Sequence, residues 1–230
     1  MRKIIIACLL CGLLALSGLA QKVKQPWNEW PKNEVDKMLP DSPWSHTQSE
    51  NDPTEMTFLG ALSSAAGMGP ARNQTIDLKY RIRLFSAKPI RGAFARTILL
   101  GNPNLKAVQL QNFVDGDYSE SIVVAVNFES NDGRISGPVS QLFGNANAAM
   151  LKANTYLERK DGKRVFLGEY SAPTSDGTGA KFVFPRNLDG KPYIVGPEEV
   201  VRFVTDLGKG IKMSWKFKAA EMMYDGKLEF

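Results

Sequence analysis

Apolar and polar residues alternate along residues 75–85, TIDLKYRIRLF. Every second side chain from Ile76 to Leu84 is apolar, whereas the positions between them hold Asp77, Lys79, Arg81 and Arg83. A repeat of two residues is typical of a strand that is buried on one face only. The pattern therefore predicts a strand whose three basic side chains point away from the core.

The hydrophobic pattern changes twice further along the chain. After Pro89 apolar residues recur at helical spacing up to Gly101, and helices are also expected over residues 104–113 and 138–150. Residues 121–128, SIVVAVNF, are apolar on both faces, which predicts a central strand. Hairpins are predicted over residues 154–170, 179–195 and 199–218, with a last short strand over 227–230.

These elements predict an α+β domain over residues 74–230. It would contain about eight strands in a mainly antiparallel sheet, with two or three helices in its first half. A pure β-sandwich is the alternative if the segment after Pro89 is only a loop.

The first 20 residues are typical of a secretory signal peptide. Arg2 and Lys3 precede an apolar run from Ile4 to Leu16, and small residues lead to Ala20, after which we expect cleavage. The run is shorter than the ~20 residues that a membrane helix needs. The mature protein is therefore expected to be secreted or periplasmic, with no transmembrane segment and no cysteine, since both cysteines lie in the signal.

Residues 21–44 hold three of the four tryptophans: Trp27, Trp30 and Trp44. A short amphipathic helix after Pro31 cannot be stable alone, so we interpret this arm as a clasp that buries its tryptophans against a core. An exposed aromatic platform for sugars or peptides is the alternative. The small and turn-forming residues of 45–73 predict a linker or long loop.

Composition limits the chemistry. Loss of Arg2 and Lys3 lowers the formal charge of +5 by two, to +3, which is too small to indicate a nucleic-acid partner. Nucleophilic catalysis of the usual kind and zinc sites both rely on histidine or cysteine, and His46 is the only histidine. We therefore predict no catalytic residues, no metal site and no cofactor.

Carboxylates leave one enzymatic alternative. The pairs Glu198–Glu199 and Asp115–Asp117, together with Asp132, fall in predicted loops or at strand ends. Two such groups can hydrolyse glycosidic bonds or hold calcium, although residues 113–120 lack the full calcium-loop spacing.

Besides the arm, the basic side chains are the feature of the sequence that most suggests a function. Lys79, Arg81 and Arg83 on one strand, with Arg91 near the end of that strand, are the candidate ligand-binding residues. Lys212, Lys216 and Lys218 form a second basic strand face. An anionic partner is one interpretation; a solvated face that discourages aggregation is the other.

Several motifs resemble a family of small exported acidobacterial proteins: W-x-E-W and D-S-P-W within residues 27–44, Y-R-I-R-L at 80–84, residues 154–167, and the terminal M-M-Y-D-G-K-L-E-F. The resemblance implies a bacterial, exported, single-domain protein and assigns no catalytic residues. We therefore expect a non-enzymatic binding or interaction domain whose partner is an anionic envelope component or a protein. The alternative is a carboxylate-dependent hydrolase of envelope or extracellular glycans.

Overall fold

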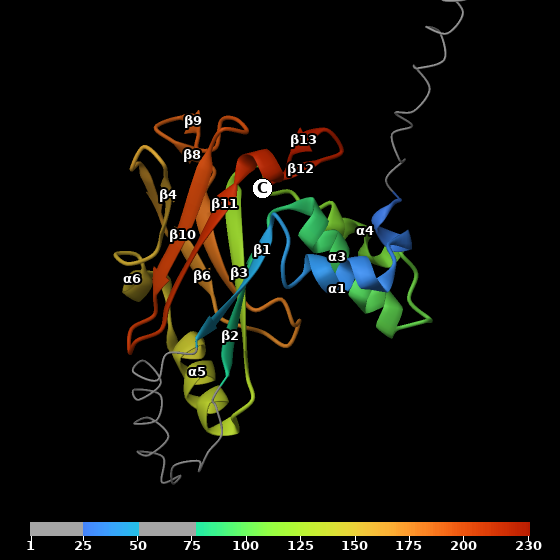
Figure 1. Cartoon of the computed structure of the whole chain (residues 1–230), viewed down its shortest axis with the longest axis horizontal. Coiled ribbons are helices and arrows are strands. Elements are labelled where there is room, and N and C mark those ends of the chain that lie inside the picture. The colour runs from blue at the N-terminus through green and yellow to red at the C-terminus, as the bar shows by residue number, and fades with distance from the viewer. Residues whose placement is uncertain (1–24, 51–76) are drawn as a thin grey trace, which may run out of the picture.

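The computed structural model describes residues 25–50 and 77–230. The predicted signal peptide and most of the predicted linker lie outside these residues. The described chain has an α+β fold in which every strand pair is antiparallel, as the hydrophobic pattern predicts (Figure 1).

Two antiparallel sheets form the centre of the molecule. Sheet A has the strand order β1 (Ser45–Glu50), β2 (Leu78–Leu84), β3 (Ser121–Ser130), β7 (Ala180–Pro185) and β6 (Glu169–Ser171). Sheet B has the order β11 (Lys212–Lys218), β10 (Val200–Asp206), β4 (Tyr156–Arg159) and β5 (Arg164–Phe166). The apolar strand β3 is central in sheet A, as predicted.

The two sheets face each other across an aromatic core. Phe203 of β10 meets both Phe182 and Phe184 of β7 edge-on, with ring centroids 5.5 and 6.1 Å apart, and all three rings are buried. The two sheets thus pack as in a β-sandwich. The segment after Pro89 is a helix, however, so the fold is α+β and not a pure β-sandwich.

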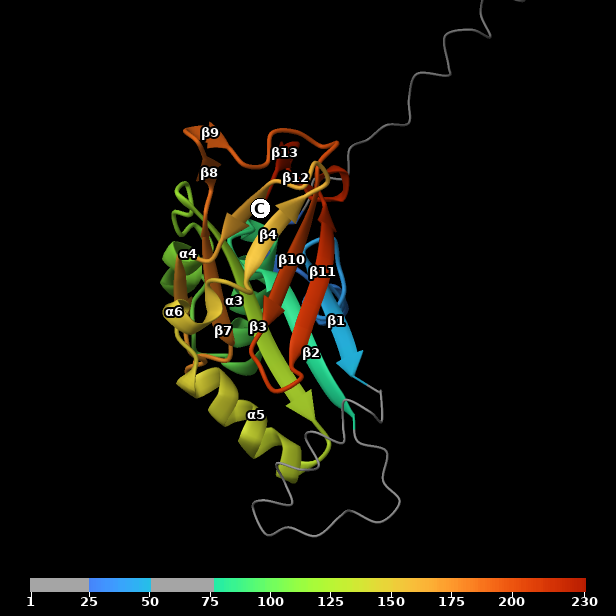
Figure 2. The same ribbon diagram turned by 90° about the vertical axis from the view of Figure 1, so that its left-hand side faces the viewer.

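Both edges of the sandwich are joined. At one edge the chain runs from β5 into β6, so that Leu167 N–H donates to Thr155 of sheet B and Gly168 N–H donates to Val183 of sheet A. At the other edge the side-chain amide of Gln48 donates to Lys212 O at 2.9 Å and accepts from Ser214 N–H at 3.1 Å. This amide links β1 to β11, which lie side by side in Figure 2.

Helices form a third layer on the face of sheet A that points away from sheet B (Figure 1). The layer contains the 3-10 turn η1 (Trp27–Glu29) and the helices α1 (Lys32–Met38), α3 (Lys88–Gly101) and α4 (Val108–Val114). Helix α5 (Gly133–Asn145) lies at one end of the sheets, and the short α6 (Ala148–Leu151) follows it. Helix α5 begins five residues before the predicted start, so Pro138 lies inside it.

The three tryptophans of the arm are buried, as the clasp interpretation requires. Trp27 and Trp30 pack with Val35 and with Ala93 and Ala95 of α3. A Cβ atom at Gly92 of α3 would lie 3.1 Å from Trp27 and 3.3 Å from Trp30, so the indoles rest directly on the helix backbone. Trp44 belongs to the main core instead, and its indole N–H donates to Glu229 O.

One expectation at the end of the first described range is wrong. Ser45–Glu50 is the edge strand β1 and not the start of a linker; its polar sequence SHTQSE hid a strand that gains its stability from backbone pairing with β2. The predicted last strand is found as β13 (Lys227–Leu228), which pairs with β12 (Met223–Tyr224) outside both large sheets. The remaining short hairpin joins β8 (Asn187–Leu188) to β9 (Lys191–Pro192).

Candidate functional site

The basic face of β2 points toward the helical layer. Lys79 and Arg81 remain partly exposed, and their side chains pair with Asp77 and Glu129 at 2.6 Å each. Arg83, in contrast, is only 3% exposed, although alternation placed it on the solvent side. Alternation assigns a residue to a face of the strand but does not tell what covers that face, and here the end of α1 and helix α3 cover it.

A pocket of about 580 Å³ opens between this face of sheet A and helices α3 and α4. Apolar side chains dominate its walls, with Arg81 and Arg83 on the sheet side. The lining is Leu39, Arg81, Arg83, Phe94, Thr97, Ile98, Leu110, Phe113, Asn127, Phe128, Glu129, Asp176, Gly177 and Thr178. A volume of this size suits a small molecule.

Arg83 is the buried cation of the pocket. Its Nε donates to Leu39 O at 2.7 Å, one terminal nitrogen donates to Asn127 Oδ1 at 2.6 Å, and the guanidinium lies 5.3 Å from the centre of the Phe94 ring. Within the described part of the chain, no carboxylate forms an ion pair with it. Burial and then the neighbouring charge of Arg81 lower the pKa of Arg83 to about 10, although the charge of Glu129 acts in the opposite direction. The group is thus still charged at neutral pH, but poorly solvated.

The loop at residues 176–179 forms a rigid wall of the pocket. Asn127 donates to Gly177 O, and Gly179 has a φ of +92° at a point where a Cβ would lie 2.4 Å from Val126 O. Burial alone would raise the pKa of Asp176, but hydrogen bonds from the N–H and hydroxyl of Thr178 and from Lys181 lower it to about 2. Asp176 is therefore an ionised structural carboxylate, unsuited to act as a general acid near neutral pH.

Arg91, the fourth predicted binding residue, lies apart from this pocket. It is 4% exposed, and its guanidinium stacks 4.5 Å over the Tyr118 ring. Its nitrogens donate to four backbone carbonyls, those of Phe85, Ser86, Val114 and Gly116. Arg91 thus ties the end of β2 to the end of α4 and has its donors engaged.

Among the five carboxylates singled out in the sequence, Asp115, Asp117 and Glu199 are each engaged by a partner of their own. Hydrogen bonds from Gln111 and Lys88 lower the pKa of Asp115, and the backbone N–H of Ser119 lowers that of Asp117. Glu199 pairs with Arg159 at 3.0 Å. Across residues 25–50 and 77–230, no group of three or more histidine, cysteine or acidic side chains is arranged to hold a metal. Within the same ranges, no helix has the length and apolar character needed to cross a bilayer.

The sequence pattern did not reveal most of the pocket walls. Phe94, Ile98, Leu110 and Phe113 were expected in helices, but their meeting with β2 depends on how α3 and α4 pack. The one local signal was the Ser-Asp-Gly-Thr-Gly segment at 175–179, whose turn-forming residues mark a loop held against β3.

Comparisons of the chain with protein-family models, with curated proteins and with solved structures found no match.

Proposed function

We propose that the mature protein is an exported, non-enzymatic binding domain that takes a ligand with an acidic head and an apolar body into the pocket between β2 and α3. The head would lie at Arg83 and the body against the aromatic and aliphatic side chains of the two helices.

One observation carries the proposal: Arg83 is a buried guanidinium without a carboxylate partner, at the wall of a largely apolar pocket. Buried charges in proteins are normally paired, because removing a charge from water is costly. An anionic head group would supply that missing partner, and a guanidinium binds a carboxylate with two parallel hydrogen bonds.

The rim of the pocket supports an amphiphilic ligand. Ile98 lines the pocket and is 37% exposed, and Leu100 and Val108 are exposed close to it in the sequence of α3 and α4. Exposed apolar side chains beside an apolar pocket favour a ligand whose chain extends from the pocket along the helices.

The remaining parts of the proposal rest on different grounds. Export rests on residues 1–20, where the charged start, apolar run and small residues are typical of a signal peptide. The non-enzymatic part of the proposal is supported by Asp115, Asp117 and Glu199, each of which is engaged by a partner of its own. A hydrolytic function has no specific geometric support.

The test compares decanoate with decanol by isothermal titration calorimetry, using the protein from residue 21 onward. Both compounds have the same chain, but only decanoate can form charge-assisted hydrogen bonds to Arg83. Such bonds contribute about 1.5–3 kcal/mol, so decanoate should bind at least about tenfold more tightly.

A matched pair of variants locates the site. Ile98→Trp fills the mouth of the pocket and should abolish decanoate binding, whereas Met150→Trp, at an exposed apolar position of α6 outside the lining, should leave it unchanged. Equal binding of decanoate and decanol, or equal binding by Ile98→Trp and the parent, would refute the proposal.

A further inference from the structure

The outer face of sheet B carries cations from three of its four strands. In each strand alternate side chains point outward: Arg202 on β10 lies opposite Lys216 on β11 and opposite Glu158 on β4. Glu158 in turn lies opposite Arg164 on β5, so that one charged row crosses the whole sheet. Lys218 continues the outward face two residues beyond Lys216, about 6.6 Å away along the strand.

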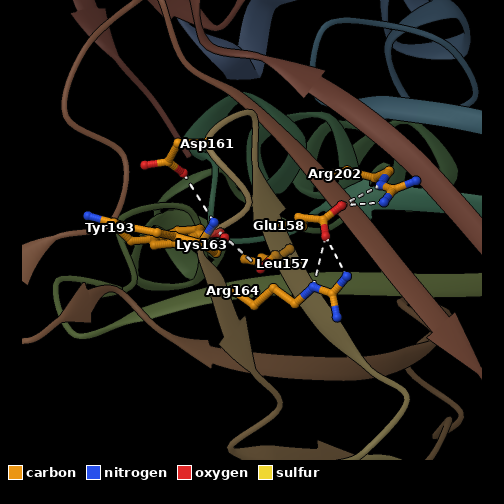
Figure 3. A network of polar contacts seen from close by, with 7 residues as sticks. All are labelled: Leu157, Glu158, Asp161, Lys163, Arg164, Tyr193 and Arg202. Atoms are coloured by element: carbon orange, nitrogen blue, oxygen red, sulfur yellow. Dashed lines mark hydrogen bonds and ion pairs between the residues drawn. The ribbon is translucent and has the colours of Figure 1, made fainter.

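Glu158 holds two arginines of this row in place, as Figure 3 shows. One carboxylate oxygen accepts from Arg164, with a salt-bridge distance of 2.7 Å, and the other accepts from Arg202. These hydrogen bonds, first from Arg202 and then from Arg164, lower the pKa of Glu158. The single carboxylate therefore fixes two guanidinium groups and leaves the row with a net positive charge.

Two hollows meet at these cations. One, of about 590 Å³, extends from Arg202, Lys216 and Lys218 to the β4–β5 turn at Lys160. The other, of about 420 Å³, extends from the same three residues to Pro43 and Trp215. Because they share three side chains, the hollows form one trough across the strands, lined by five basic and two acidic side chains.

Two lysines of the trough have no carboxylate partner within the described part of the chain. Lys216 stands at the centre and Lys160 at one end, and neither forms an ion pair with a described residue, whereas Lys218 pairs with Glu221 at 2.8 Å. The turn that carries Lys160 is anchored from below, since the Tyr193 hydroxyl lies 2.9 Å from both Leu157 O and Lys163 O (Figure 3). Lys160 therefore lies on an anchored turn, and Lys216 lies on a strand that is paired with β10.

We infer that this trough binds a linear acidic polysaccharide, with carboxylates of successive sugars on Lys160, Arg202 and Lys216. The extended shape suits a chain, and the several cations that line the trough suit a polymer with repeated negative charges. Pro43 at the other end adds a small apolar surface against which a sugar ring can pack.

Other polyanions fit less well. Single-stranded nucleic acids need several aromatic side chains on which successive bases stack. The trough has only Trp215 in its lining, and His46 already stacks on that indole at 3.4 Å. A bilayer presents a broad charged surface, whereas here the cations lie in a concave trough.

The experiment uses polygalacturonate as the probe and its fully methyl-esterified form as the neutral counterpart, with binding measured by biolayer interferometry between 50 and 200 mM NaCl. We expect the acidic polymer to bind, to weaken steeply with salt as exposed charges are screened, and to lose at least tenfold in affinity in Lys160→Ser/Lys216→Ser. The control Lys106→Ser/Lys152→Ser removes the same charge from exposed sites outside the trough and should bind like the parent.

Three results would overturn the inference: equal binding of the esterified polymer, an equal loss in both double variants, or binding to anionic phosphatidylglycerol vesicles but not to polygalacturonate. Decanoate binding by Lys160→Ser/Lys216→Ser should be unchanged, because the trough lies on the outer face of sheet B, whereas the pocket at Arg83 lies on the outer face of sheet A. The two sites can therefore fail independently.

Discussion

Arg83 and Arg91 are both almost fully buried, and neither forms an ion pair with a carboxylate in the described chain, yet their surroundings differ. Arg91 donates to four backbone carbonyls and stacks on Tyr118. Arg83 has two acceptors, Leu39 O and Asn127 Oδ1, and lines an apolar pocket.

The comparison separates two uses of a buried cation. Backbone carbonyls around Arg91 replace its water shell, so the arginine holds the loop after β2 to the end of α4. Arg83 has only two acceptors, so its water shell is only partly replaced, and the pocket beside it leaves room for an anion. The number of acceptors around a buried arginine, and the space beside it, therefore distinguish a structural role from a binding role more clearly than its burial does.

Replacing Arg91 should have the largest effect on stability. Arg91→Met leaves buried carbonyls without donors, and each such loss costs about 1–3 kcal/mol, so the free energy of unfolding should fall by roughly 5 kcal/mol. Urea unfolding followed by tryptophan fluorescence measures this free energy of unfolding. A loss no larger than that of the exposed control Lys106→Met would contradict the structural role.

The clasp that covers α3 is expected to matter almost as much. Trp30→Ala removes a ring that is 5% exposed, packs on Gly92 and meets Tyr224 edge-on, and the cavity should cost roughly 3–5 kcal/mol. The melting temperature should fall clearly, and less in Trp30→Phe. If stability stayed the same while decanoate binding disappeared, the arm would be a binding platform and not a clasp.

Replacing Arg83 should have the smallest effect on folding. Arg83→Met leaves two acceptors without a donor but also removes a poorly solvated charge, so we expect a loss of only about 1 kcal/mol. Decanoate affinity should nevertheless fall at least about tenfold. A stability loss as large as that of Arg91→Met would erase the difference between the two arginines.

Sequence patterns predicted the elements with strong periodicity. Strand β2 and helix α3 were predicted closely, because alternation and helical spacing are local signals. Strand β1 was missed, since Ser45–Glu50 is polar and pairs with residues about thirty positions away. Long-range pairing leaves no local trace in such a sequence.

Part of the candidate site could likewise be predicted from local patterns, and part of it could not. Arg81 and Arg83 were selected because they share a face of one strand. The pocket itself needs α3, α4 and the loop at 176–179 to meet that face, and no local pattern encodes this packing. Arg91 was selected for its charge and its expected place near the end of β2, and only its four carbonyl partners reveal what it does.

The Gln48 amide between β1 and β11 has a consequence for contacts between copies of the protein. A free sheet edge exposes a row of N–H and C=O groups to which a strand of another molecule can add. Here one side chain occupies Lys212 O and Ser214 N–H, and His46 stacks on Trp215 beside it. Two backbone groups of the β11 edge are thus satisfied within one molecule, which disfavours growth of the sheet from this edge into another copy even when many copies are crowded together.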